Sequence, residues 1–340
     1  MKQAILFLHF LMMTSIFPLT AFPEEIIQSI DQLSSLEKDQ IDISRVCLLF
    51  AKEIYPDLNV DDYSNKLDQM VKEIQQFTGN NTDPDYRIRA LNTYLYQRQG
   101  FHYDTEDPYA QKLKNRYING LLDTKSGSCF TMPLLYLALA QRLGYPVYPV
   151  SAPQHLFLRY VDPKLQMQNI EATGGGGYAS DEDYTHDMEI PRRGIDSGVY
   201  LKTMNYKELL AELFAENACY WAKNCNAPKA IRYFEESLKF NPKAAEVYRL
   251  FANLNFEMVK YDQNDYILQA FKDPLSRMQE EKRQLRIRDQ HIIKGKELMR
   301  KAYELGIAPP LPKNYWLIQE QNHIEHKLSM GGTREAHLYP

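Results

Sequence analysis

Two residues of this chain, Cys129 and His155, have types and positions suited to nucleophilic chemistry. Cys129 lies in "SGSCFTMPLLYLALAQRLG", directly before an apolar stretch that predicts a helix from Thr131 to Leu143. Proline is tolerated only in the first turn of a helix, so Pro133 places Cys129 close to the helix N-terminus. Such a terminus favours the thiolate, which is the form of cysteine that attacks, and its free N–H groups can hold an oxyanion.

A nucleophilic cysteine needs a base, usually a histidine that a third polar group orients. His155 begins "HLFLRYV", which predicts a strand, and "MQNIEAT" predicts the next strand. A three-residue turn between the two would place Glu171 opposite His155, with Asn169 as an alternative partner from a diagonal position. A two-residue turn would instead place Ala172 opposite His155 and move Glu171 to the other face.

Gln154 and Arg159 are weaker candidates for contact with a substrate. Gln154 precedes the histidine and could polarise the site. Arg159 lies on the same strand face as His155 and could bind a substrate carboxylate, although a rim cation is the alternative. An isolated cysteine is more often buried and inert than catalytic. The small residues Gly127 and Ser128, the helix start and the histidine and carboxylate that follow favour the catalytic interpretation.

The elements that must position these residues are predicted to be helices in the N-terminal part of the chain, followed by a helix and strands around the candidate residues. Residues 22–125 form a predicted helical layer, with helices expected at "NVDDYSNKLDQMVKEIQQF", "YRIRALNTYLYQRQGF" and "PYAQKLKNRYINGLLDT". Residues 126–175 combine the apolar helix with three short strands, which indicates a small antiparallel sheet. Glycines 174–177 are expected to form a flexible rim loop, and "SDEDYTHDMEIP" a solvated acidic loop without cation-binding spacing.

The chain from 205 to 320 is predicted to be helical throughout. Ala230, Phe234 and Pro242 have the spacing of a 34-residue helix-turn-helix repeat, and this stretch resembles a degenerate tetratricopeptide repeat. The charged residues 262–290 are interpreted as an insertion that interrupts the array. Residues 321–340 are polar and are expected to form a disordered tail.

The motifs "GSCFTMPLLYLALAQRLG", "PQHLFLRY" and "NIEATGG" together resemble the transglutaminase-like superfamily, in the bacterial branch where this domain precedes tetratricopeptide repeats. The resemblance implies a domain over 22–204 with an α+β, papain-like fold, in which a central helix packs on the sheet. It further implies Cys129 as nucleophile, His155 as general base and acid, and Glu171 as orienting carboxylate. The superfamily more commonly has Asp at the third position.

Two functions of different classes follow. The first is a thiol hydrolase or acyl transferase that cleaves an amide bond of a protein or peptide through a thioester, with water or an amine as acceptor. The second is a catalytically inactive scaffold whose helical repeats bind a protein or peptide partner. The chemistry of the first function needs no cofactor, and the sequence has no set of residues with zinc-ligand spacing.

The N-terminus predicts export. Residues 1–21 have the charged start, apolar run and small-residue end of a cleavable signal, so we expect a secreted or periplasmic protein without a membrane span after cleavage. The net charge of −4, with acids and bases interspersed, gives no argument for nucleic acid as a partner. Among the other cysteines, Cys47 is expected to be buried, and Cys219 and Cys225 could form a disulfide if a helix ends between them.

Overall fold

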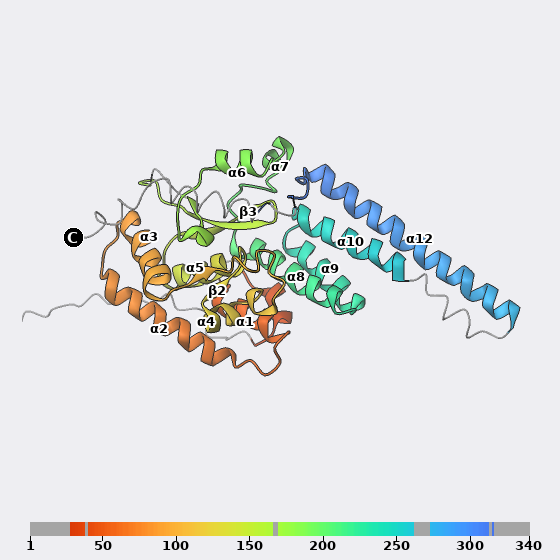
Figure 1. Cartoon of the computed structure of the whole chain (residues 1–340), viewed down its shortest axis with the longest axis horizontal. Coiled ribbons are helices and arrows are strands. Elements are labelled where there is room, and N and C mark those ends of the chain that lie inside the picture. The colour runs from red at the N-terminus through yellow and green to blue at the C-terminus, as the bar shows by residue number, and fades with distance from the viewer. Residues whose placement is uncertain (1–27, 38–39, 166–168, 262–272, 313–314, 316–340) are drawn as a thin grey trace, which may run out of the picture.

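The computed structural model describes residues 28–37, 40–165, 169–261, 273–312 and 315. The fold is mixed α+β and mainly helical, with two small sheets. An N-terminal helical layer and the larger sheet enclose a central helix, α5, and a group of long helices extends from one side of this body (Figure 1). The predicted signal segment and the predicted tail lie outside the described residues.

The N-terminal layer consists of helices, three of which begin with a side-chain cap. Asp42, Asn59 and Asp83 accept hydrogen bonds from the first backbone N–H groups of α1, α2 and α3, which fixes where each helix begins. The bounds of these elements are Ile43–Lys52 for α1, Val60–Thr78 for α2, Pro84–Asn92 for α3, Thr93–Arg98 for a π-helical continuation and Ile118–Thr124 for α4. The first two predicted helices of this layer are therefore present.

The third predicted helix, over 108–124, is wrong in its first part. Only a short 3-10 turn, Leu113–Asn115, precedes α4. The Asp107 carboxylate accepts hydrogen bonds from the N–H groups of Gln111 (2.7 Å) and Lys112 (2.9 Å). A side chain that binds backbone N–H groups in this way competes with helix formation. The segment is thus a structured loop, and it later forms one wall of a groove.

The central helix α5, Thr131–Arg142, confirms the predicted apolar helix. Its residues from Thr131 to Ala140 are all buried, so the helix has no solvent-facing side over that length. It packs against α1, α2, α4 and both β3 and β4. The chain leaves the helix at Gly144, whose φ of 70° is a left-handed conformation that glycine adopts without strain. The residues just before this helix are therefore held at the centre of the domain.

The larger sheet has the antiparallel order β3-β4-β5, with bounds Val147–Ala152, His155–Tyr160 and Asn169–Ile170. β3 and β4 are joined by a two-residue turn, Pro153-Gln154, because Ala152 pairs with His155. A second, parallel pair joins β1 (His102–Tyr103) to β2 (Ser126–Gly127), directly before the cysteine. Both sheets therefore end beside Cys129.

The predicted register between β4 and β5 is wrong by two residues. Leu158 pairs with Ile170 and Arg159 with Asn169, which would continue to a pairing of Phe157 with Glu171. The predicted three-residue turn is replaced by a longer connection. A shift of two residues keeps every side chain on the same face, whereas a shift of one would reverse them all. Glu171 therefore remains on the face of His155, at a diagonal position.

The acidic segment after the glycines is a helix, which corrects the predicted solvated loop. The helix α6 spans Asp181–Asp187 and begins with a capping box between Ser180 and Asp183. Tyr184 of α6 is buried with Val150 and Phe157 in a small second core on the outer side of the sheet. A short helix α7, Arg192–Asp196, follows. The sheet is therefore covered on both faces, by α5 and by α6.

Among the described residues, the C-terminal part contains α8 (Tyr206–Lys223), α9 (Ala227–Phe240), α10 (Ala245–Tyr261) and α12 (Pro274–Leu305). They pack mainly as two pairs, α8 with α9 and α10 with α12. The described helices between residues 206 and 305 agree with the predicted helical character of this part of the chain. Their assignment as tetratricopeptide repeats remains a prediction.

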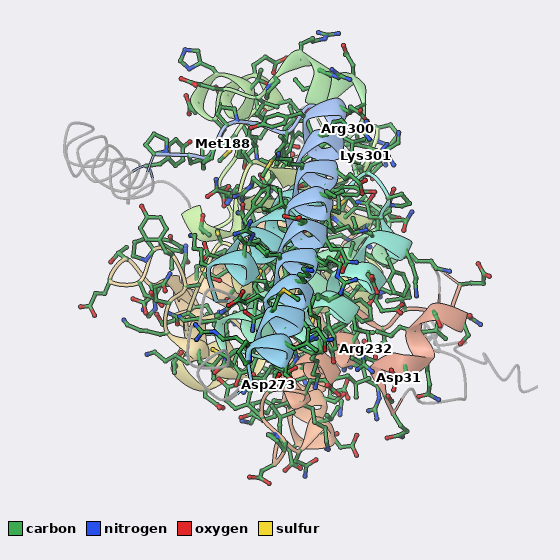
Figure 2. All side chains as sticks on the ribbon, turned by 90° about the vertical axis from the view of Figure 1, so that its right-hand side faces the viewer. Asp31, Met188, Arg232, Asp273, Arg300 and Lys301 are labelled. Atoms are coloured by element: carbon green, nitrogen blue, oxygen red, sulfur yellow. The ribbon has the colours of Figure 1, made fainter. Side chains whose placement is uncertain are left out.

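Residues 262–272 of the predicted insertion lie outside the described residues. Residues 274–290 are the first half of α12, a continuous helix of 32 residues. Figure 2 views this helix along its exposed side, from Asp273 at one end to Arg300 and Lys301 near the other. Ion pairs one turn apart, such as Arg277–Glu281 at 3.4 Å, support the charged half of the helix.

The other three cysteines are not bridged. Cys47 is buried in α1 as predicted, and burial raises the pKa of its thiol. Helix α8 does end between Cys219 and Cys225, yet both thiols are free. Over the described ranges, the structure has no helix with the length and apolar character to cross a membrane, and no group of three or more potential metal-ligating side chains.

Candidate active site

Cys129 lies between β2 and the first turn of α5. The preceding residue, Ser128, accepts hydrogen bonds at its hydroxyl from the N–H groups of Phe130 and Thr131, each at 3.3 Å. Gly127 is required for close packing, since a Cβ there would lie 2.8 Å from side-chain atoms of Leu121 and Thr131. The N–H of Cys129 itself donates to no acceptor within the described part of the chain. The thiol is partly exposed at the helix N-terminus, as the sequence predicts.

The β3–β4 turn brings His155 to Cys129. Gln154 occupies the turn with a φ of 54°, and its carbonyl oxygen lies 3.9 Å from the Cys129 sulfur. The His155 side chain is 1% exposed, so the ring is fully enclosed while the thiol beside it remains accessible. A hydrogen bond with the Cys129 thiol is among the interactions that act on the pKa of His155.

Glu171 holds the other end of the imidazole. The distance from His155 Nε2 to Glu171 Oε2 is 2.7 Å. The second carboxylate oxygen, Oε1, accepts from the N–H of Thr173 at 3.1 Å and from its hydroxyl at 2.6 Å. Because Glu171 caps the 3-10 turn Ala172–Gly174 in this way, its longer side chain folds back toward the sheet. The glutamate thus reaches the imidazole although its side chain is one methylene longer than that of aspartate.

The charges of the pair stabilise each other against burial. Burial alone would lower the pKa of His155, but the Glu171 carboxylate and the Cys129 thiol outweigh it and raise that pKa to about 10. Burial alone would raise the pKa of Glu171, but His155 and the hydrogen bonds from Thr173 and Tyr184 lower it to about 2. At neutral pH the pair is therefore an imidazolium and a carboxylate.

This pair predicts a pH window for stability. The stabilisation from His155 is complete below its ordinary pKa of 6.5 and is lost as the pH rises through about 10. The stabilisation from Glu171 is complete above its ordinary pKa of 4.5 and is lost as the pH falls through about 2. The Glu171→Gln variant should therefore lose most unfolding free energy, relative to wild type, between pH 4.5 and 6.5.

Urea unfolding at pH 5.5 and pH 9.5 measures this effect. We expect a larger difference between wild type and Glu171→Gln at the lower pH, because protonated His155 then has lost its carboxylate partner. The exposed acid Glu235 supplies a matched Glu→Gln control. An equal difference at both pH values would contradict the charged state of the pair.

The sequence did not indicate Tyr184, although it contacts the carboxylate directly. Its hydroxyl donates to Glu171 Oε2 at 2.7 Å, the same oxygen that His155 contacts. Its ring stacks on Phe157 with centroids 4.1 Å apart. The available signal was the capping box at Ser180 and Asp183, which predicts a helix and so a fixed direction for Tyr184. Tyr184 and Thr173 complete the hydrogen bonding of the carboxylate.

Removing the Tyr184 hydroxyl should weaken this arrangement. We expect Tyr184→Phe to lower the unfolding free energy by about 2 kcal/mol, since the lost hydrogen bond is to a charged, partly buried group. Urea unfolding measures the loss. The same substitution at Tyr303, which is 65% exposed, is the control and should have little effect. Equal stability of Tyr184→Phe and wild type would mean that this bond does not help to hold Glu171.

The remaining predicted site residues have other positions. Asn169 is not a partner of the histidine; it accepts from Arg159 Nε at 2.8 Å and donates to Asp181 Oδ1 at 2.8 Å. Arg159 also donates to Asp181 Oδ1 (2.5 Å) and to the carbonyl of Leu201 (3.0 Å). Its guanidinium therefore joins the sheet to α6 and does not face the thiol. The Gln154 carbonyl lies 3.9 Å from the Cys129 sulfur, and a role of Gln154 in polarising the site remains a prediction.

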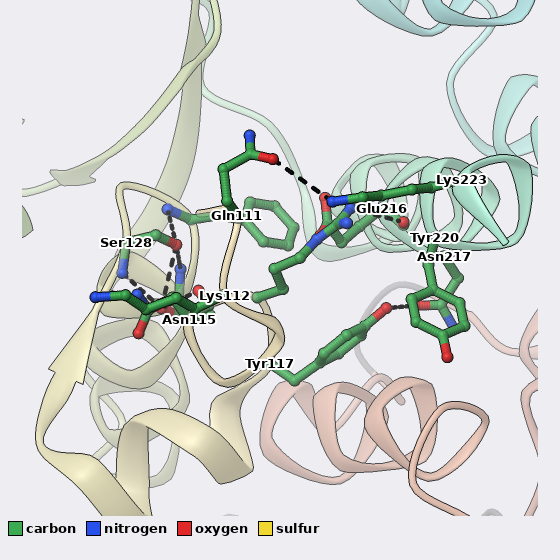
Figure 3. A network of polar contacts seen from close by, with 12 residues as sticks. Gln111, Lys112, Asn115, Tyr117, Ser128, Glu216, Asn217, Tyr220 and Lys223 are labelled. Carbon is green, nitrogen blue, oxygen red and sulfur yellow. Dashed lines mark hydrogen bonds and ion pairs between the residues drawn. The ribbon is translucent and has the colours of Figure 1, made fainter. Parts of the chain in front are cut away.

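A groove with a volume of about 510 Å³ passes the thiol. One wall is the loop around Gln111 together with Cys129 and Gln154, and the other is a face of α8 with Leu250 of α10. Figure 3 shows the two walls, with a hydrogen bond of 3.5 Å from Lys223 of α8 to Gln111 of the loop between them. Cys129 and the C-terminal helices therefore share one groove.

Comparisons with known proteins match the part of the chain that contains this site. Residues 61–215 match the family model of the transglutaminase-like superfamily. The chain is 22% identical to a UPF0162 protein of Xylella fastidiosa over 226 aligned residues. The alignment covers 64% of this chain and 79% of that protein. A stretch of 73 residues is 37% identical to F-box only protein 21 of Homo sapiens. This stretch covers 22% of this chain and 11% of that protein.

Among solved structures, one crystal structure of menin aligns with 88% of this chain and 89% of its own, at 13% identity and a TM-score of 0.38. That structure reveals the binding site of menin for the Mixed Lineage Leukemia protein.

Proposed function

We propose that the protein is an exported thiol hydrolase or acyl transferase that acts on an amide bond of a protein or peptide. The observation that carries this proposal is the 2.7 Å contact between His155 and Glu171, on the ring that also meets the Cys129 thiol. A buried ion pair next to a partly exposed thiol holds, on His155, the proton that catalysis must move. Secretion or transfer to the periplasm, through residues 1–21, is part of the proposal.

The reaction would proceed in two steps. The Cys129 thiolate attacks the amide carbonyl, and His155 gives its proton to the departing amine, so that a thioester forms and the C–N bond breaks. Neutral His155 then takes a proton from the acceptor, which attacks the thioester and releases the thiolate. Water as acceptor gives hydrolysis, and an amine gives transfer. The N–H of Cys129 is suited to hold the oxyanion in both steps.

A second candidate is a catalytically inactive scaffold that binds a protein partner through its C-terminal helices. The observation in its favour is on α12, where Leu275, Leu285 and Ile293 are 60%, 48% and 58% exposed. Exposed large apolar residues on one helix are a feature of binding surfaces. This candidate predicts no covalent intermediate on Cys129.

Acetylation by p-nitrophenyl acetate tests the two candidates against each other. An activated thiolate attacks the ester, displaces p-nitrophenolate and carries the acetyl group as a thioester. We expect mass spectrometry to find this acetyl group on the Cys129 peptide before it appears on exposed Cys225. The Cys129→Ala variant, with Cys225 intact, is the control. Acetylation that is no faster at Cys129 than at Cys225 would favour the scaffold.

A further inference from the structure

The groove beside Cys129 contains one carboxylate without a countercharge, Glu212 of α8. The other acids nearby have cationic partners: Glu216 pairs with Arg116, and Glu246 pairs with Arg249. In the described part of the chain, no ion pair or hydrogen bond involves the Glu212 side chain. Burial and the neighbouring Glu246 raise the pKa of this carboxyl to about 7, which is the response of a carboxylate that lacks a cation.

The lysine side chains close to Glu212 or on the same face of α8 have other partners. Lys202, which lines a small pocket together with Glu212, pairs with Glu208 at 2.8 Å. Lys223 of the same helix face lies eleven residues further on, which is about 16 Å along α8. That lysine contacts Gln111 across the groove instead. In the described part of the chain, no cation is therefore left to pair with Glu212.

The shape of the groove suggests how such a cation would arrive. Glu212, Ala215, Glu216, Cys219 and Lys223 are spaced so that they share one face of α8, and all five line the groove. A groove about 16 Å long holds about five residues of extended polypeptide. Its acidic end at Glu212 and basic end at Lys223 would give such a segment a preferred direction.

We infer that Glu212 determines substrate specificity: the groove takes an extended polypeptide segment, and Glu212 binds a lysine or arginine side chain of that segment. This inference rests on the proposed function, because it concerns the substrate that Cys129 would attack. An ion pair with the partly buried Glu212 is screened less than one on an open surface and therefore discriminates more strongly. A segment with glutamate or aspartate at the same position would be rejected.

Charged thiol reagents test the inference without a known substrate. Cationic 2-aminoethyl methanethiosulfonate and anionic 2-sulfonatoethyl methanethiosulfonate react in the same way, since the thiolate displaces methanesulfinate and forms a mixed disulfide. At pH 8, where Glu212 is ionised, we expect the cationic reagent to modify Cys129 at least about tenfold faster than the anionic one. In Glu212→Gln the ratio should fall about fivefold. Peptide mass spectrometry separates Cys129 from Cys219, which lies in the same groove.

Controls separate this inference from the proposed function. Glu235→Gln changes the net charge by the same amount, but Glu235 is exposed on α9 and lies outside the groove. In this variant the ratio of the cationic to the anionic modification rate of Cys129 should match that of wild type. Trilysine should slow the reaction of Cys129 with neutral methyl methanethiosulfonate in wild type and not in Glu212→Gln, whereas triglutamate should protect neither. An unchanged charge ratio in Glu212→Gln would overturn the inference alone. Neutral-reagent reactivity of Cys129 no greater than that of Cys225 would overturn the proposed function.

Discussion

Replacing His155 by Ala is expected to slow acetylation of Cys129 by p-nitrophenyl acetate by about 100-fold at pH 7. His155 contacts both the thiol and Glu171, so under the proposed function its loss removes the imidazolium that lies beside the sulfur. Stopped-flow release of p-nitrophenolate, together with the mass of the Cys129 peptide, measures the rate. An effect of this size would exceed that of any surface substitution.

The control for this prediction is His186→Ala. The His186 side chain is 91% exposed on α6 and lies close to Tyr184 in sequence, but it has no contact with the thiol. Its removal should leave the acetylation rate unchanged. A His155→Ala protein that folds and still acetylates Cys129 at the wild-type rate would show that the imidazole does not assist the sulfur.

Replacing Gly120 by Ala is expected to destabilise the fold by about 3 kcal/mol or more. A Cβ on Gly120 would lie 2.0 Å from the backbone oxygen of Lys114, which cannot move aside as a flexible side chain could. Relief requires separation of α4 from the 3-10 turn Leu113–Asn115. The Asn115 carbonyl in that turn accepts a hydrogen bond from Thr131 at the start of α5 (3.3 Å), so the displacement would also reach the cysteine.

Urea unfolding of Gly120→Ala and Gly177→Ala tests this effect with the same chemical change. Gly177 has a φ that other residues adopt, and the nearest atom to its added Cβ would be 3.4 Å away, which is ordinary contact. We expect little change in unfolding free energy for Gly177→Ala. Two variants with similar stability would mean that α4 does not pack closely on the turn.

The sequence predicted the position of Cys129 well because local rules determine it. A fully apolar stretch, a proline allowed only in the first turn and a glycine after the last turn leave little freedom for α5. The contact between His155 and Glu171 was predicted from a register that proved wrong. The predicted contact is still present because the observed register differs from the predicted one by two residues, and a shift by an even number keeps each side chain on the same face of the sheet.

The remaining features depend on tertiary contacts that local patterns do not contain. Helix α6 has few apolar residues, and its stability comes from a capping box and from one buried residue, Tyr184. The sequence makes Arg159 a candidate for substrate binding because its pairing with Asp181 joins two different elements and leaves no local pattern. The groove beside Cys129 is formed by segments about 100 residues apart, such as Gln111 and Lys223.

The pH dependence of Cys129 alkylation by iodoacetamide tests the central claim most directly, namely that the thiol, His155 and Glu171 act as one unit. Cys225 is exposed in the same molecule and serves as an internal reference. We predict that the Cys129 peptide is alkylated at pH 6 at a rate close to its rate at pH 8, while Cys225 reacts appreciably only near the pKa of a free thiol, about 8.5. Coincident pH profiles for the two cysteines, unchanged in His155→Ala, would contradict the account.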